Sequence, residues 1–222
     1  MATIDLTDRF PRVLRALHDQ GWMGITQFRM WRQVAEYLHG NHAIFEYAPA
    51  YWTITTNTLF DQSLLSVSRL LDTHSGAASV EYLLNLAESG ADAFKGNGSK
   101  KVILAQVAED RKRLDRLRST AKPIRTKRDK VLAHLDRTRA ADLNQLASMF
   151  PVDPAVVEEI FGELSEVVNT YSGFWEDSET KWDLIGGDDF KGIGRLLGMG
   201  KKAEDDEWER RFGRPRRRRV NS

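Results

Sequence analysis

The sequence RDKVLAH at residues 128–134 places an arginine, an aspartate and a histidine in one predicted helical segment. Arg128 and His134 are six residues apart, so on a regular helix they differ by about 240° and do not share a face. One chain alone would therefore build a poor site from them. A two-fold dimer with this segment near its axis would gather two copies of each residue in one cleft.

The two side chains are of types that act on phosphate esters. Histidine has a pKa of ~6.5 and can move protons, whereas arginine binds phosphate oxygens through a planar, permanently charged fork. RNA carries its own nucleophile, the 2′-hydroxyl group, so these two groups suffice in principle to cleave it without a metal ion. Asp129 could accept a hydrogen bond from the arginine or orient the imidazole.

A purely structural interpretation of the same residues is open. A histidine near the end of an amphipathic helix is most often a surface residue or a satisfied core residue, and Arg128 could simply pair with Asp129 or Asp136. Composition alone favours this interpretation over a catalytic one.

Two segments of the sequence carry a resemblance to a known family. An arginine, a polar residue, a short apolar run and then Ala-His resembles the signature of the HEPN superfamily. About 60 residues upstream lie LLSVSRLLD at residues 64–72 and SVEYLL at residues 79–84. These stretches are similar to the AbiU-like branch of that superfamily, which is associated with phage abortive infection. The likeness covers roughly residues 30–170.

The resemblance implies an all-α, up-and-down helical bundle that forms a homodimer. Many members of the superfamily act as metal-independent endoribonucleases, often as toxins or antiphage effectors. By this resemblance Arg128, Asp129 and His134 would be the catalytic motif for RNA cleavage, with no cofactor and no metal. Arg69 and Asp72 match the upstream segment and are possible supporting residues.

Two other functions remain open for this sequence. Some members of the superfamily have lost catalysis, so the chain could be an inactive module that binds RNA or a nucleotide. Alternatively, it could be an interaction protein that docks an antitoxin or a phage-sensing partner. Trp182, Trp208 and Phe212 are the exposed anchors that we expect for such a partner.

Apolar residues recur at helical spacing along most of the chain. The pattern predicts helices over residues 7–21, 28–38, 49–72, 79–90, 100–120, 141–150 and 156–175. Pro123 restarts the chain as a new helical piece that carries Arg128. The charged face of the helix over 100–120, which includes Asp110 and Arg113, is expected to be solvated.

The composition changes after Asp177, so we place a domain boundary between a bundle at residues 1–177 and an irregular, Gly-rich segment with a basic tail at residues 178–222. The last 22 residues hold nine Lys or Arg and five Asp or Glu, although the whole chain carries a net charge of only +1. The tail would add salt-sensitive affinity for RNA or would only increase solubility. Its basic residues are Arg214, Arg216, Arg217, Arg218 and Arg219.

Composition also argues against several classes of protein. The chain has no cysteine, which excludes disulfides and thiolate metal sites. It has neither a signal sequence nor an apolar run of ~18 residues, so we expect a cytoplasmic protein without a membrane segment. His39 and His42 flank Gly40-Asn41, which favours a loop over a metal site, and Gly192-Ile193-Gly194 lacks the third glycine of a dinucleotide-binding loop.

Overall fold

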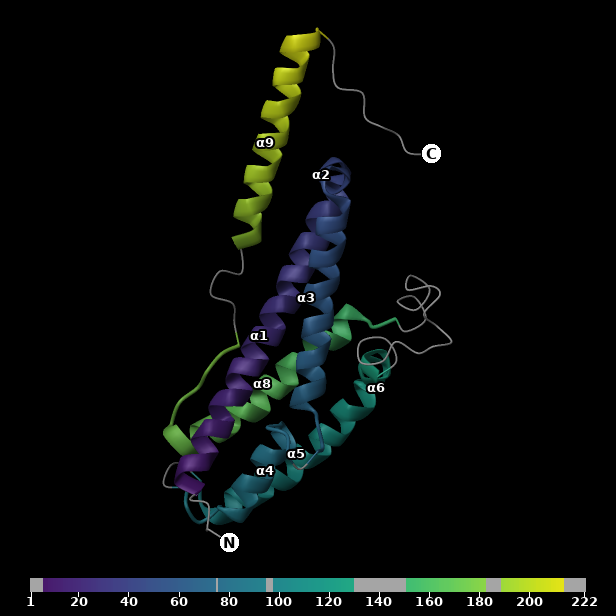
Figure 1. Cartoon of the computed structure of the whole chain (residues 1–222). Helices are drawn as coiled ribbons and strands as arrows, with labels where there is room; N and C mark the ends of the chain where they lie inside the picture. The colour runs from purple at the N-terminus through teal and green to yellow at the C-terminus, as the bar shows by residue number, and fades with distance from the viewer. Residues whose placement is uncertain (1–5, 75, 95–97, 130–150, 183–188, 214–222) are drawn as a thin grey trace. The chain divides into compact units, whose positions relative to one another are not determined.

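The computed structural model describes residues 6–74, 76–94, 98–129, 151–182 and 189–213. Within these ranges the chain forms eight helices and no strand (Figure 1), so the all-α prediction is confirmed. The helices are α1 (Leu6–Gly40), α2 (His42–Tyr47), α3 (Pro49–Leu70), α4 (Val80–Ser89), α5 (Lys100–Thr120), α6 (Lys122–Lys127), α8 (Pro154–Glu176) and α9 (Asp189–Phe212). None of these described helices is long and apolar enough to cross a membrane.

The chain divides into two compact units. Unit 1 comprises Met1–Thr26 and Asp61–Asp183, and unit 2 comprises Gln27–Phe60 and Leu184–Ser222. Helices α1 and α3 therefore contribute residues to both units. This division differs from the single boundary that we expected at residue 178, because residues 27–60 also belong to unit 2.

Unit 1 is built on α4, α5 and α8, which pack against one another (Figure 1). The apolar stripes predicted from the sequence turn inward here, and burying each large side chain contributes about 1.5–3 kcal/mol. Two side chains cap these helices: Ser79 accepts a hydrogen bond from the N–H of Tyr82, and Asp153 accepts one from the N–H of Ala155. The fully buried residues include Leu83, Leu84, Ile103, Leu114, Ile160, Phe161 and Leu164.

Helix α1 does not end at Gly21, as the sequence analysis expected, but continues to Gly40. A Cβ added at Gly21 would lie 2.3 Å from the Trp182 ring, and one added at Gly24 would lie 2.6 Å from the Cβ of Ser66. These glycines are positions of close packing inside the helix. A glycine in a helix costs about 1 kcal/mol relative to alanine, and here the close approach of neighbouring side chains offsets that cost.

The charged face of α5 is more ordered than the sequence suggested. Asp110 is only 2% exposed and accepts hydrogen bonds from the hydroxyl of Tyr171 (2.9 Å) and the amide of Gln106 (3.1 Å). Arg113 binds Glu163 and Glu166 on α8. The expectation of a merely solvated face was therefore wrong for these residues.

Unit 2 has its own apolar cluster. Val34, Leu38, Ile44, Trp52 and Phe190 are buried against one another. The indole N–H of Trp52 donates to the carbonyl oxygen of Ile44 (3.1 Å), which satisfies the polar group of a buried aromatic residue. This cluster joins α1, α2 and α3 to the start of α9.

The Gly-rich stretch that we expected to be irregular contains the regular helix α9. The hydroxyl of Tyr37 on α1 donates to the carbonyl oxygen of Gly194 (2.7 Å), and a Cβ at Gly194 would lie 2.9 Å from the ring of Tyr37. The glycine allows α9 to approach α1 closely. Packing within unit 2 thus overrides the low helix propensity of glycine.

Candidate active site

The segment that carries Arg128 begins where Pro123 restarts the chain. Helix α5 ends at Thr120, and α6 begins at Lys122 with Pro123 in its first turn, as predicted. Regular α-helix ends at Lys127, and Arg128 and Asp129 continue in a wider, π-helical turn. The angle of about 240° between Arg128 and His134 assumed an unbroken α-helix from Arg128 onward, whereas Arg128 and Asp129 form a π-helical turn; residues 130–134 lie outside the described residues, so the angle stays a prediction.

Arg128 is paired with the next residue in the sequence. Both its Nε and one of its terminal nitrogens lie 2.7 Å from the same Asp129 carboxylate oxygen, Oδ1. The side chains of Arg128 and Asp129 are 29% and 52% exposed. Asp129 therefore orients the guanidinium, and the Arg128 side chain stays partly exposed. This contact agrees with one of the two roles predicted for Asp129.

The segment before Arg128 is strongly basic. Lys122, Arg125 and Lys127 lie on α6, and Lys122 and Arg125 are exposed. Lys127 is buried and acts electrostatically on Asp61 of α3. Burial raises the pKa of Asp61, and Lys127 opposes that rise. The sequence analysis missed these three cations, although the charge run in KPIRTKRDK at residues 122–130 was the signal for them.

The other half of the predicted motif cannot be placed. His134 lies outside the described residues, and so do Arg214, Arg216, Arg217, Arg218 and Arg219 of the tail. The pairing of Arg128 with His134 and the role of the tail stay predictions. Among the described residues, no group of three or more histidines and carboxylates could hold a metal ion.

Arg69 and Asp72 lie at the end of α3. Asp72 accepts a hydrogen bond from the backbone N–H of His74 (2.9 Å), and Arg118 of α5 donates to the carbonyl oxygen of Leu71 (3.4 Å). Asp61, on which Lys127 acts electrostatically, lies eight residues before Arg69, or about 12 Å along α3. The described contacts thus place the upstream residues at the level of Arg118 and not beside Arg128. Their supporting role stays a prediction.

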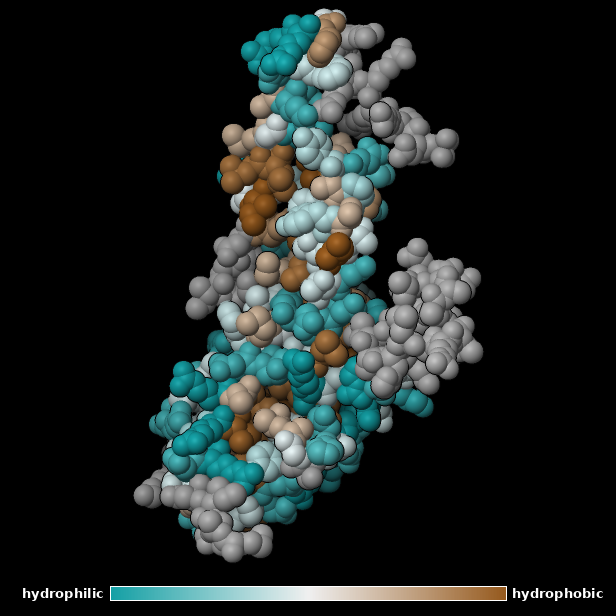
Figure 2. All heavy atoms as spheres, in the orientation of Figure 1, coloured by the Kyte–Doolittle hydropathy of each residue, from teal (hydrophilic) through white to brown (hydrophobic). Residues whose placement is uncertain are grey.

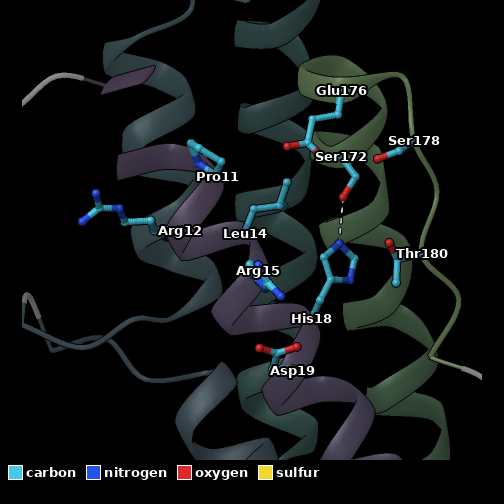
Figure 3. Close-up of a pocket in the computed structure, with 10 residues that line it drawn as sticks. All are labelled: Pro11, Arg12, Leu14, Arg15, His18, Asp19, Ser172, Glu176, Ser178 and Thr180. Atoms are coloured by element: carbon cyan, nitrogen blue, oxygen red, sulfur yellow. Dashed lines mark hydrogen bonds between the residues drawn. The ribbon is translucent and has the colours of Figure 1, made fainter. Parts of the chain in front are cut away.

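A cleft of about 470 Å³ lies elsewhere in unit 1, between α1 and the end of α8 (Figure 3). The Nε2 of His18 lies 2.8 Å from the hydroxyl of Ser172 in its wall, and the indole N–H of Trp182 donates to Nδ1 of His18 (3.0 Å). The residues that line it are Pro11, Arg12, Leu14, Arg15, His18, Asp19, Ser172, Glu176, Ser178 and Thr180.

The histidine and serine of this cleft do not form a nucleophilic pair. Because Trp182 donates to Nδ1, the proton of neutral His18 is on Nε2 and is donated to Ser172. Burial lowers the pKa of His18, while Asp19 and Glu176 oppose this effect. His18 is therefore a satisfied structural histidine. Trp182 is only 4% exposed, so its predicted role as an exposed anchor was wrong, whereas Phe212 is 54% exposed.

A comparison with protein families identifies the family of the chain. The family model HEPN_AbiU2, described as AbiU2, matches residues 9–193, which is most of the chain. The chain belongs to the AbiU2 family. The match includes both sequence segments that suggested the HEPN superfamily, so that resemblance is confirmed. No curated protein and no solved structure matches the chain.

Proposed function

We propose that the protein is a metal-independent endoribonuclease of the HEPN type that acts in abortive infection. The observation that carries the proposal is Arg128, a partly exposed arginine that Asp129 orients in a basic segment, in a member of the AbiU2 family. An oriented, always protonated guanidinium fits the oxygens of a phosphodiester.

In the proposed reaction the 2′-hydroxyl of RNA attacks the adjacent phosphorus. The imidazole of one His134 takes the 2′-proton as the new O–P bond forms, and the bond to the 5′-oxygen breaks. That oxygen leaves with a proton from water, and the imidazolium returns its proton to solvent, so one His134 serves each site. Arg128 stabilises the negative charge that develops on the phosphorane oxygens. The products are a 2′,3′-cyclic phosphate and a 5′-hydroxyl group.

The direct test is to incubate labelled total RNA with the purified protein in the presence of EDTA. We expect cleavage by the wild type and none by His134→Ala. Equal cleavage by the two proteins, or cleavage that EDTA abolishes, would argue against the proposal. Binding by the wild type without turnover, weakened in Arg128→Ala, would support the alternative, an inactive RNA-binding module.

A second experiment tests the proposal that two chains share the site. Arg128→Ala and His134→Ala should each cleave RNA very slowly alone. A mixed dimer of the two retains one intact combination if Arg128 of one chain works with His134 of the other. We expect partial recovery of cleavage on mixing. If both mixed and unmixed proteins are inactive while wild type cleaves, the two residues act within one chain.

A further inference from the structure

Helix α9 has one face that unit 2 already covers. Phe190 is 7% exposed within the apolar cluster, and Leu197 packs against the same cluster. Gly194, about one turn after Phe190, lies against Tyr37. These residues lie within about 60° of one another around the helix and form its packed side.

A second face of α9 is apolar and exposed. Ile193, Leu196 and Met199 recur every third residue, within about 120° around the helix, and are 49%, 69% and 63% exposed. Gly192 and Gly200 lie on the same face, and nothing lies within 4 Å of a Cβ built on either. Figure 2 shows hydrophobic side chains gathered over the first half of α9. Large exposed apolar side chains that cluster in this way mark an interaction surface.

Cations border this apolar face. Residues 190–203 hold four cations and no carboxylate. Three of these cations, Lys191, Arg195 and Lys202, are exposed and lie within about 40° of one another, next to Met199 around the helix. Arg195 and Lys202 form no ion pair with any described residue. The first half of α9 is therefore a basic amphipathic helix, a pattern that is typical of segments that bind membrane surfaces.

The second half of α9 is acidic and pairs locally. Residues 204–209 hold five carboxylates. Two of them form ion pairs one turn away, Asp205 with Lys201 and Glu207 with Arg211. These pairs leave the cations beside the apolar face available to another partner.

We propose that the first half of α9 docks on the surface of a lipid bilayer that carries anionic headgroups. The apolar side chains enter the outer part of the acyl region, while Arg195 and Lys202 bind headgroup phosphates and carboxylates. The stripe from Ile193 to Met199 runs about 9 Å along the helix. This length suits a helix that lies in the plane of the headgroups and not one that crosses the ~30 Å core of the bilayer.

The chemistry of the apolar face favours lipid over a groove in another protein. The side chains on this face, at residues 192, 193, 196, 199, 200 and 203, include no hydrogen-bonding group. Protein interfaces carry about one hydrogen bond per 100–200 Å², whereas acyl chains need none. The glycines between the projecting side chains leave an uneven ridge, which fluid acyl chains cover without a matching set of pockets.

This surface is separate from the Arg128 site. The family match ends at residue 193, so most of α9 lies beyond it. The proposal does not rest on ribonuclease activity, and its test does not use RNA.

The first test is cosedimentation of the full-length protein with vesicles at low salt. We expect binding to vesicles of equal parts phosphatidylcholine and phosphatidylserine, and much weaker binding to phosphatidylcholine alone, because the cations need anionic headgroups. No binding to the anionic vesicles would mean that another partner covers the face. That result, or equal binding to both kinds of vesicle, would overturn the proposal.

The double variant Arg195→Ala/Lys202→Ala tests the cations. Each cation near an anionic surface contributes about fivefold, so the affinity for the anionic vesicles should fall about 20-fold. The control Arg15→Ala/Lys101→Ala removes two exposed cations of unit 1, neither of which has an ion pair with a described residue. It should lose less than about threefold. Equal losses in the two double variants would mean that net charge drives binding, and wild-type affinity in Arg195→Ala/Lys202→Ala would mean that α9 takes no part. Both results contradict the proposal.

Leu196→Ser tests the apolar face. The leucine side chain leaves water on docking, so its loss should weaken vesicle binding about tenfold. Ile54→Ser on α3 is the control, because Ile54 is 66% exposed in the same unit, and it should bind as the wild type does. Equal affinities of the two variants for the anionic vesicles would argue against docking through α9.

A fluorescent label reports which part of α9 enters the bilayer. The chain has no cysteine, so an environment-sensitive fluorophore can be attached to Gly200→Cys on the apolar face or to Glu209→Cys in the acidic half. On adding the anionic vesicles, we expect a blue shift of the emission from position 200 and little change at position 209. Equal shifts at the two positions, or no shift at position 200, would rule out the proposed orientation.

Discussion

The arginines of α5 and Arg128 differ in where their partners come from. Arg118 binds Glu81 on α4, Arg111 binds Glu88 on α4, and Arg113 binds Glu163 and Glu166 on α8. Each of these ion pairs joins two helices. Arg128 binds Asp129, its neighbour in the sequence, so its pair joins no helices. A ligand phosphate can take the place of a neighbouring carboxylate without separating packed elements.

The same contrast separates two histidines. His18 has a partner on each ring nitrogen, and burial lowers its pKa. These features stabilise one neutral tautomer. The proposed role of His134 requires the opposite, a ring that gains and loses a proton near neutral pH. The α5 arginines and His18 therefore stabilise the fold, whereas Arg128 and His134 are the residues that we propose for the reaction.

Of the substitutions that we predict, Arg128→Ala should have the largest effect, a loss of RNA cleavage and not of stability. We expect Arg128→Ala to reduce RNA cleavage about 10²–10³-fold, because the charge on the phosphorane loses its cation. The free energy of unfolding should change by less than about 0.5 kcal/mol. Cleavage rates and urea unfolding measure the two quantities.

Arg12→Ala is the control for this prediction. Arg12 also has a local partner, Asp8 at 2.9 Å, but lies on α1. Its replacement should leave both cleavage and stability unchanged. If Arg128→Ala unfolds the protein instead of inactivating it, the contrast with the α5 arginines is wrong.

Replacing Asp110, whose buried hydrogen bond to Tyr171 lies beside the α5 arginines, should have the largest effect on stability. Asp110→Ala leaves the hydroxyl of the fully buried Tyr171 without its acceptor, and an unsatisfied buried group costs about 1–3 kcal/mol. Chemical denaturation should show a loss of about 2 kcal/mol, with cleavage per folded molecule unchanged. A variant as stable as wild type would show that another acceptor replaces Asp110.

Arg113→Ala should have a smaller effect. Hydrogen bonds from Arg113 lower the pKa of Glu163, but Glu166 is largely exposed, so solvent screens part of the interaction. We expect a loss of about 1 kcal/mol that shrinks at high salt. The neighbouring Lys112→Ala, which removes an exposed pair with Glu109 on the same helix, should cost less than about 0.5 kcal/mol. Equal losses of stability in the two variants would mean that an ion pair between two helices stabilises the protein no more than an ion pair within one helix.

Replacing His18 should have the smallest effect on the free energy of unfolding, and the effect should depend on pH. Its pKa is lower in the folded protein than in the unfolded chain, so the unfolded chain binds a proton first as the pH falls. His18 therefore contributes stability that is present above pH ~6.5 and is lost as the pH falls through its folded pKa. His18→Gln should show a weaker loss of stability than the wild type as the pH falls below about 6.5. Identical pH profiles for the two proteins would show that His18 is not buried as a neutral residue.

The helical bundle could be predicted from the sequence because its helices have regular apolar stripes. The stripes over 79–90, 100–120 and 156–175 correspond to α4, α5 and α8. The glycines were misread. Gly21 was taken as a helix end and the glycines of residues 192–200 as an irregular segment, yet both occur inside helices. Contacts with Trp182 and Tyr37 decide these cases, and such distant contacts are not visible in local sequence.

The candidate site was predictable only in part. The motif spacing indicated Arg128 and Asp129, and the structure joins them in one ion pair. The burial of Asp110 and Trp182 was missed, because each depends on a partner about 60 or more residues away in the sequence, Tyr171 for Asp110 and His18 for Trp182. Charge and aromatic character alone indicated exposed residues in both cases.

The most direct test of the proposed chemistry is the end-group analysis of RNA fragments produced in EDTA by wild type and by His134→Ala. We predict 2′,3′-cyclic phosphate and 5′-hydroxyl ends from the wild type and no fragments from the variant. Fragments with 5′-phosphate ends, or the same fragments from both proteins, would contradict a reaction in which the 2′-hydroxyl attacks and His134 moves the proton.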